Sequence, residues 1–274
     1  MSQRTIRLLI AYDGGNYCGW QRQRQGEPTI QEELELRLSH LCGEPITLHG
    51  AGRTDAGVHA LGMVAHFQTR AAIPVVAFFK GLNAILPMDI RILAAEEART
   101  DFHSRFHAAG KTYRYDFFTG PVQPPCARLH RAHLPGRFDP KCFADGLASL
   151  VGTHDFSSFE RSGSRDKTAI GGRGAVRTLT ALSCTPALGQ PDCWSIRVTG
   201  DGFLRQMVRI LAGTLIEIGQ GKEEGKALPE ILCARDRRRA GLTAPACGLY
   251  LERIYYPFPV FNDHFGSCSP PVIP

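Results

Sequence analysis

A single carboxylate stands among glycines in the segment Gly50–Ala60, whose sequence is GAGRTDAGVHA. Glycines let a backbone turn sharply and let another molecule approach it closely. Predicted strands over Ile46–His49 and Leu61–Phe67 would hold Asp55 on a rigid loop, which suits a reactive group. On spacing alone, an Asp among glycines is more often a turn former that bonds its own backbone. The segment by itself leaves both roles open.

The elements that must position this loop follow the order β-α-β-β-α-β. Hydrophobic patterning predicts strands over Arg4–Tyr12, Ile46–His49, Leu61–Phe67 and Ile90–Ala95, with helices that start at Thr29 and Pro74. Thr29 and Glu32 form a capping box, and Gly43 suits the end of the first helix. The second helix carries Val76, Phe79, Leu82 and Leu86 on the face expected to be buried. This order is typical of a ferredoxin-like unit.

A similar order recurs in the second half of the chain. Strands are predicted over Lys111–Phe118, Ala175–Cys184, Cys193–Thr199 and Gly248–Tyr256, and helices over Pro140–Val151, Phe203–Ile218 and a short piece near Pro229–Ala234. The halves share order without evident sequence identity. We therefore predict an α+β fold with two ferredoxin-like units, residues 1–108 and 109–257. Their antiparallel sheets would flank a central basic cleft, and residues 258–274 would form a Pro-rich tail.

Composition narrows the class of protein. Lys and Arg number 32 against 26 Asp and Glu, a formal net charge of +6 that fits a polyanionic partner without proving one. The N-terminus lacks a signal-peptide pattern, and no stretch approaches the length of a membrane span. The nine cysteines show neither a C-x-x-C pair nor zinc-finger spacing. We expect a reduced, cytoplasmic protein without a membrane segment or a metal site.

Several familiar motifs fail. A P-loop ending in Gly110-Lys111 would need glycine where Arg105 stands. Gly172-Arg173-Gly174 cannot begin a dinucleotide fingerprint, since Arg177 holds the third glycine position. His59 and His66 lie on one predicted segment without a second partner at ligand spacing, so they are expected to be core or surface imidazoles.

The run Gly52–Ala60 resembles the catalytic loop of the tRNA pseudouridine synthase A family. Other segments resemble that family in the expected order: Tyr12–Gly14, Tyr17–Gln21, Asp101–Phe106, Lys111–Tyr115, Phe203–Arg209 and Gly248–Leu251. Several ordered matches are far more specific than one short motif, so they favour the catalytic role for Asp55. The resemblance implies a pseudouridine synthase fold and isomerisation of uridine in RNA, with Asp55 as nucleophile and with neither a metal nor another cofactor.

The resemblance also assigns roles around the nucleophile. Arg209 matches the arginine that pairs with the catalytic Asp, and such a cation favours the ionised carboxylate. Arg205 and Arg209 stand four residues apart, which predicts one shared face on a largely apolar helix. Tyr113 matches the tyrosine that lies against the target base, and Leu249 matches the apolar residue on the opposite wall of the pocket.

Further residues are implied in RNA binding. Arg53 resembles the arginine that enters the position vacated by the target base. The stretch Phe102, His103, Ser104, Arg105 and Phe106 matches an RNA-contacting segment, in which we expect one of the two phenylalanines to be core. The Gly-rich basic segment Arg161–Arg177, which includes Lys167, falls where the family has another RNA-binding loop, although a flexible solvated loop is the simpler alternative. Arg70 lies near the place of a basic base-flipping residue.

The resemblance implies a homodimer that modifies positions thirty-eight to forty of the tRNA anticodon stem-loop. Recognition would then depend on RNA shape and backbone rather than on base sequence. Two alternatives stay open at this point. The chain could be a non-catalytic RNA-binding protein, or a related synthase that acts on a different RNA or site.

Overall fold

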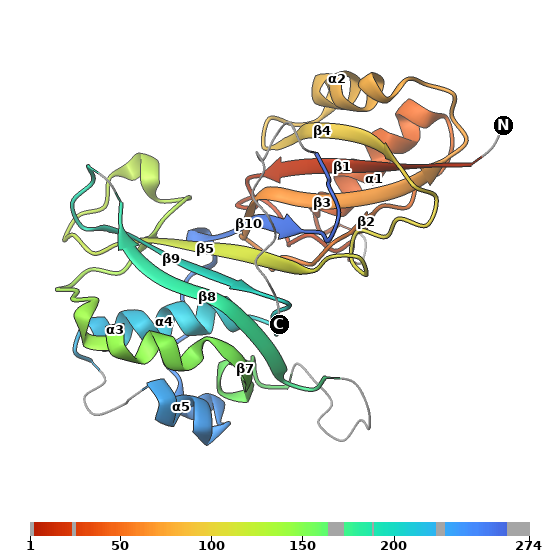
Figure 1. Ribbon diagram of the computed structural model, residues 1–274. Helices are drawn as coiled ribbons and strands as arrows, with labels where there is room; N and C mark the ends of the chain where they lie inside the picture. The colour runs from red at the N-terminus through yellow and green to blue at the C-terminus, as the bar shows by residue number, and fades with distance from the viewer. Residues whose placement is uncertain (1–2, 24–25, 164–172, 188, 223–227, 262–274) are drawn as a thin grey trace. The chain divides into compact units, whose positions relative to one another are not determined.

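The computed structural model describes residues 3–23, 26–163, 173–187, 189–222 and 228–261. The chain divides into two compact units. The described residues up to Ala109, together with those from Tyr250 onward, form the first unit, and Gly110–Leu249 contains the second. Both units are mixed α+β, with mostly antiparallel strand pairing (Figure 1).

The first unit contains the predicted β-α-β-β-α-β order. Its elements are β1 (Arg4–Tyr12), α1 (Ile30–Cys42), β2 (His49–Gly50), β3 (His59–Thr69), α2 (Val75–Ile85), β4 (Ile90–Ala98) and most of β10 (Leu249–Tyr255). The sheet order is β4-β1-β3-β10, and the short β2 also pairs with β3. The β1–β4, β1–β3 and β2–β3 pairs are antiparallel, whereas β10 runs parallel to β3, with Tyr250 opposite His59.

The last strand differs from the sequence prediction, which placed it in the second unit. Tyr250 and Leu251 pair with β3, and Ala109 N donates to Tyr255 O at 2.8 Å. The first unit is therefore built from both ends of the chain. Hydrophobic alternation identifies a strand but does not reveal which sheet receives it, because the pairing partner is remote in sequence.

Helix α1 follows its predicted signals closely. Thr29 accepts a hydrogen bond from Glu32 N at 3.3 Å, and Gly43 adopts the left-handed conformation that ends the helix. Ile30, Leu34 and Leu38 have no exposed surface, so this face of α1 belongs to the core of the first unit.

The buried face of α2 agrees with the prediction only in part, at Leu82 and at the following Leu86. Phe78 and Leu82 are fully buried, whereas Val76 and Phe79 are 51% and 38% exposed. The ring of Phe78 packs at 5.3 Å from that of Phe67 on β3. The first turns of α2 carry apolar residues on nearly every side of the helix. Hydrophobic periodicity therefore could not identify the face that points inward.

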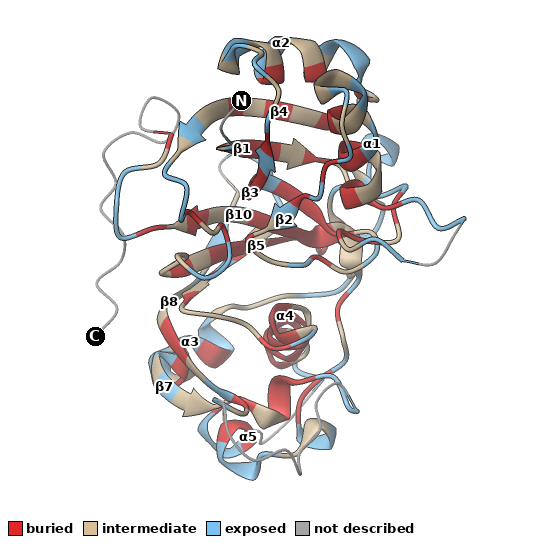
Figure 2. Ribbon diagram, turned by 90° about the vertical axis from the view of Figure 1, so that its right-hand side faces the viewer, coloured by how far each residue is buried: buried red, intermediate tan, exposed pale blue. Residues whose placement is uncertain are grey.

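The second unit contains a sheet of order β5-β9-β8-β7, and β6 pairs parallel to β5. Its strands and α-helices are β5 (Gly110–Phe118), β6 (Ala132–His133), α3 (Lys141–Leu147), β7 (Gly152–Asp155), β8 (Val176–Pro186), β9 (Cys193–Gly200), α4 (Met207–Gly219) and α5 (Leu228–Ala234). Short 3-10 helices span Pro125–Ala127, Ala148–Leu150, Ser157–Phe159, Arg237–Arg239 and Ala246–Gly248. In Figure 2, α4 is coloured as buried along nearly its whole length.

Helix α4 starts later than predicted. Gln206 has φ 60°, and the helix begins at Met207 rather than at Phe203. Arg205 therefore precedes the helix, and the prediction that it shares a helical face with Arg209 was wrong. Phe203 and Leu204 are apolar at a spacing that would continue the helix, but the left-handed residue between them and Met207 interrupts it. Among the helices that the structure describes, none is both long and apolar enough to cross a membrane.

Candidate active site

Asp55 lies half-buried on the loop between β2 and β3, and backbone hydrogen bonds anchor this loop on both sides of it. Trp20 N donates to Thr54 O at 3.1 Å, and Gly57 N donates to Tyr17 O at 3.3 Å. Val58 N donates to Asp55 O at 3.2 Å, which closes a turn at the carboxylate-bearing residue. Asp55 is thus part of a tight turn. This turn fixes the place from which its side chain projects.

Two glycines let the segment after β1 pack directly on this loop. A Cβ atom on Gly14 would lie 2.0 Å from Val58 O, and one on Gly19 would lie 2.6 Å from Thr54 O. Gly19 also has φ +100°, a conformation that other residues rarely adopt. Both positions therefore require glycine, which gives a physical reason for the Tyr12–Gly14 and Tyr17–Gln21 segments noted in the sequence.

Two buried aromatic side chains support the same loop. Tyr12 Oη lies 2.9 Å from Thr54 Oγ1, directly beside Asp55 in sequence. Trp20, 2% exposed, covers Gly50, where a Cβ atom would lie 2.6 Å from the indole ring. The sequence analysis did not identify these supporting roles. The resemblance had marked both segments, but their contacts depend on tertiary folding.

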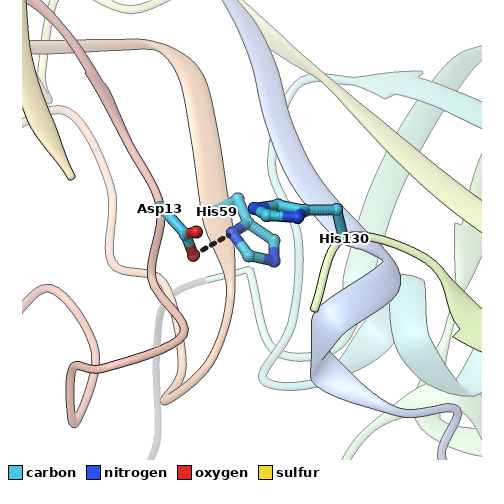
Figure 3. Close-up of side chains that lie close together, drawn as sticks. All are labelled: Asp13, His59 and His130. Atoms are coloured by element: carbon cyan, nitrogen blue, oxygen red, sulfur yellow. Dashed lines mark ion pairs between the residues drawn. The ribbon is translucent and has the colours of Figure 1, made fainter. Parts of the chain in front are cut away.

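A histidine joins the ends of β1 and β3. His59 Nδ1 lies 3.0 Å from Asp13 Oδ1 and 3.2 Å from Gly14 N, and Figure 3 shows the imidazole of His59 turned toward the Asp13 carboxylate. His59 is 1% exposed, and its ring stacks on Tyr250 at 4.8 Å. Of the two environments expected from the sequence, core or surface, His59 therefore has the first. Its pair with Asp13 carries charge on both partners only when the imidazole is protonated.

In the second unit, Arg209 lies in the first turn of α4. Its Nε donates to Ala244 O at 2.8 Å, and Ala244 N donates to Arg209 O at 3.1 Å. A Cβ atom on Gly213 would lie 1.9 Å from Leu242 O, so α4 packs directly against the backbone before β10. These contacts fix the guanidinium relative to its own unit.

The two residues assigned to base binding are mostly buried. Tyr113 on β5 is 8% exposed, and its ring meets that of Phe203 edge to face at 5.0 Å. Leu249 is 7% exposed and begins β10. Both side chains belong to ordered elements, so neither would need to be immobilised when a base binds.

The Phe102–Phe106 segment of the first unit alternates between core and surface. Phe102 and Ser104 are buried, whereas Arg105 is exposed and Phe106 is 75% exposed. Ser104 Oγ donates to His49 O, and Tyr256 Oη donates to Ser104 O, each at 2.6 Å. Phe102 is therefore the phenylalanine that belongs to the core, Ser104 is buried with it, and Arg105 and Phe106 face outward.

The remaining residues assigned to RNA binding lie apart along the chain. Arg53 is exposed on the Asp55 loop. Arg70 is exposed after β3, where its backbone N donates to Glu44 Oε1 at 2.7 Å. Arg205 is exposed, and its carbonyl accepts a hydrogen bond from Arg161 N at 3.1 Å. Lys167 lies outside the described residues.

The chain is similar to known tRNA pseudouridine synthases over both of its units. A family model described as tRNA pseudouridine synthase matches residues 8–107 and 147–257. The chain is 49% identical to tRNA pseudouridine synthase A 1 of Desulfotalea psychrophila, and the alignment covers 92% of this chain and 100% of the relative. It is 46% identical to tRNA pseudouridine synthase A of Geotalea uraniireducens and 43% identical to that of Acetivibrio thermocellus, each with the same coverage.

These matches extend over both units and include the Asp55 loop and α4. The chain therefore belongs to the tRNA pseudouridine synthase family. Its class is that of an isomerase acting on tRNA, and the mixed α+β architecture is consistent with the fold of that family.

Proposed function

We propose that this chain converts uridine to pseudouridine at positions thirty-eight to forty of the tRNA anticodon stem-loop, with Asp55 as nucleophile and without a cofactor. The observation that carries the proposal is the way in which the surrounding loop holds Asp55. The residue is half-buried on a loop whose backbone is fixed by Tyr17 and Trp20, within a chain of the tRNA pseudouridine synthase family. Fixed geometry of this kind lowers the cost of aligning a nucleophile with its substrate.

The reaction balances without a co-reactant. The bond between C1′ and N1 of uridine breaks, the uracil turns, and a new bond joins C1′ to C5. N1 gains a proton, and C5 loses one. The Asp55 carboxylate must be ionised to act on the nucleoside, because a protonated acid is a poor nucleophile.

Arg209 is proposed to keep Asp55 ionised. A guanidinium can hold a carboxylate through two parallel hydrogen bonds, which favours the charged form of the acid. The contact between Arg209 Nε and Ala244 O supports this role, because it orients the guanidinium before substrate binds. Tyr113 would stack on the extruded uracil, and Leu249 would form the opposite wall of the pocket.

Extrusion of the uracil from the RNA stack costs a few kcal/mol, and stacking of the base on an aromatic ring such as that of Tyr113 offsets about 1–3 kcal/mol of this cost. We assign Arg53 to the space that the uridine vacates. His103, Arg105, Phe106, Arg205, Arg70 and Lys167 are proposed RNA contacts, whereas buried Phe102 and Ser104 would act by shaping their segment. Two ferredoxin-like units that flank a basic cleft are the arrangement expected for such a site.

The decisive experiment compares the wild-type chain with Asp55→Asn and Asp55→Ala on a panel of tRNA transcripts. Pseudouridine-specific chemical labelling would locate each product. After reaction with wild-type protein, the label should appear in the anticodon stem-loop. Both variants should give no product and still bind tRNA. Turnover by either variant would exclude Asp55 as the nucleophile. If wild-type protein binds tRNA without modifying it, the non-catalytic alternative is correct, and labelling at another position would indicate a different site specificity.

Two further parts of the proposal, the homodimer and the absence of a metal cofactor, have direct tests. A homodimer predicts twice the chain mass in sedimentation, and a fully active monomer would contradict it. A reaction without a metal cofactor predicts full activity after treatment with a zinc-selective chelator, with magnesium retained to keep tRNA folded. A cytoplasmic location agrees with the eight cysteines in the described residues, all of which are free thiols.

A further inference from the structure

Four aromatic rings are in contact with one another, and two of them belong to the segment assigned to RNA binding. The ring of Phe106 stacks on that of His103 at 4.1 Å, with an interplanar angle of 28°. His66 meets His103 at 4.7 Å, and His49 stacks on His66 at 5.1 Å. All four residues belong to the first unit, so the cluster is formed within one compact part of the chain.

The outer ring pair is held in place before any ligand arrives. His103 Nδ1 accepts hydrogen bonds from Arg105 N at 3.1 Å and from Phe106 N at 3.3 Å. His103 N in turn donates to His107 Nδ1 at 3.2 Å. Because these bonds fix the orientation of the imidazole, Phe106 rests on a preorganised support, and little side-chain freedom remains to be lost on binding.

Two imidazoles of this cluster, those of His66 and His103, favour their neutral form. Burial lowers the pKa of His66 to about 4, and repulsion from neighbouring histidines acts in the same direction. Burial also lowers the pKa of His103, with further contributions from His49, His107 and Arg105. At neutral pH the support under Phe106 is therefore a neutral aromatic ring, and the exposed cation of the segment is the guanidinium of Arg105.

Phe106 presents its ring to solvent. It is 75% exposed, whereas the other two exposed phenylalanines of the described chain, Phe79 and Phe258, are 38% and 39% exposed. One face of the Phe106 ring is covered by His103, which leaves the opposite face available to a flat ligand. An exposed aromatic face beside a cation is the combination that binds single-stranded nucleic acid, in which bases stack and phosphates pair with positive charge.

The position of the cluster relates it to the catalytic loop. His49 begins β2, and Asp55 follows it by six positions, so the two Cα atoms lie no more than about 22 Å apart. A nucleotide a few positions from a uridine held at Asp55 is therefore within reach of this cluster. Bases in loops are unpaired and can be splayed out for stacking.

We propose that Phe106, supported by His103, is a nucleobase-stacking platform that takes a second, unpaired base of the same tRNA, distinct from the target uridine. The Arg105 guanidinium contacts an adjoining phosphate. The inference rests on the proposed function for the identity of the RNA. It adds a specific binding site to the general assignment of this segment to RNA contact.

The test measures the affinity of an anticodon stem-loop for four proteins: wild type, Phe106→Ala, Phe106→Leu and Phe106→Trp. Loss of one stacked base weakens binding about 5- to 150-fold. Phe106→Ala should show that loss, Phe106→Leu should recover little of it, and Phe106→Trp should bind at least as tightly as wild type. Phe79→Ala is the matched control, because it removes an exposed phenylalanine from α2 and should leave affinity unchanged.

A double-mutant cycle identifies the base. Stem-loops with one abasic nucleotide are titrated against wild type and Phe106→Ala. At one position near the target uridine, the abasic change and the substitution should each weaken binding, and their combination should be no worse than either alone. Fluorescence of the tryptophan in Phe106→Trp should be quenched by intact RNA and restored by the abasic change at that position, whereas Phe79→Trp should not respond.

The proposal of a stacking platform is overturned if Phe106→Ala binds RNA as tightly as wild type does. It is overturned as well if the loss of affinity caused by Phe106→Ala adds fully to the loss caused by every abasic change. It is also overturned if leucine restores affinity as well as tryptophan, because an apolar contact without stacking would then suffice. Thermal unfolding of each variant separates these results from misfolding. Failure of the proposed function has a different signature: wild-type protein would make no pseudouridine, whatever Phe106 contributes to binding.

Discussion

Tyr12 Oη lies 2.9 Å from Thr54 Oγ1, and both residues are buried. Tyr12 ends β1, whereas Thr54 immediately precedes Asp55 on the following loop. The contact ties the proposed nucleophile to the centre of the first sheet. Together with the glycine contacts at Gly14 and Gly19, it explains how a loop without regular structure can hold one carboxylate in a fixed place.

Removing the Tyr12 hydroxyl should affect catalysis more than RNA binding. Tyr12→Phe leaves the ring in place but deprives Thr54 of a buried partner, which costs about 1 kcal/mol of unfolding free energy. The Asp55 loop gains freedom, and we expect kcat to fall about tenfold with little change in KM. Tyr17→Phe is the matched control, because its hydroxyl donates to Asp89 at 2.7 Å and does not contact Thr54. An equal loss of kcat in both variants would argue against a specific role for Tyr12.

A methyl group at Gly14 should displace the catalytic loop. The added Cβ would lie 2.0 Å from Val58 O, a backbone atom that cannot move alone. Overpacking of this kind costs about 1–3 kcal/mol, and a shift of the loop by about 1 Å can lower activity about 100-fold. Gly81→Ala on α2 is the control, since its nearest neighbour lies at 3.5 Å and alanine favours the helix. Chemical denaturation and product labelling would measure both effects, and a fully active Gly14→Ala variant would contradict the expected displacement.

Substitution of Arg209 separates charge from geometry. Arg209→Lys keeps the positive charge but loses the planar fork, whereas Arg209→Ala loses both. A charge-assisted hydrogen bond contributes about 1.5–3 kcal/mol, so the alanine variant should be at least about tenfold less active than the lysine variant. Arg128→Ala, at an exposed arginine of the same unit, should retain full activity. An Arg209→Lys variant as active as wild type would exclude a need for bidentate pairing, and equal activities of the two variants would show that the positive charge alone contributes nothing.

Acid should destabilise the first unit through His66. Its folded pKa of about 4 lies below the ordinary value of 6.5, chiefly because of burial and then because of repulsion from His103, His49 and His107. Protons therefore bind the unfolded chain more readily than the folded one. The contribution of neutral His66 to the free energy of unfolding is complete above pH 6.5 and is lost as the pH falls toward 4. Between pH 7.5 and pH 5 the loss from this group is about 2 kcal/mol.

His66→Asn provides the comparison, because an amide oxygen can accept the hydrogen bond that Ser104 N donates to His66 Nδ1. Urea denaturation of both proteins at several pH values would give the difference in unfolding free energy. That difference should shrink as the pH is lowered, since only the wild-type chain carries the titrating imidazole. A difference independent of pH would show that the pKa of His66 is the same in the folded and the unfolded chain.

Local signals in the sequence were sufficient for some elements and insufficient for others. The Thr29 cap and Gly43 gave α1 correctly, since both act on backbone groups within one turn. The inward face of α2 could not be chosen, because its apolar residues surround the helix and only contact with Phe67 selects Phe78. The start of α4 was missed because the left-handed conformation of Gln206 depends on packing around it rather than on local preference.

The sequence alone determined the family, the candidate nucleophile and most of the secondary structure, because ordered motifs and hydrophobic spacing are local properties of the chain. Tertiary structure decided that β10 returns to the first unit, that Tyr12 meets Thr54, and that His66 packs against His103. Each of these contacts joins residues on different elements or fixes a side chain by packing. Such contacts arise only when apolar faces are buried together, and no short stretch of sequence encodes them.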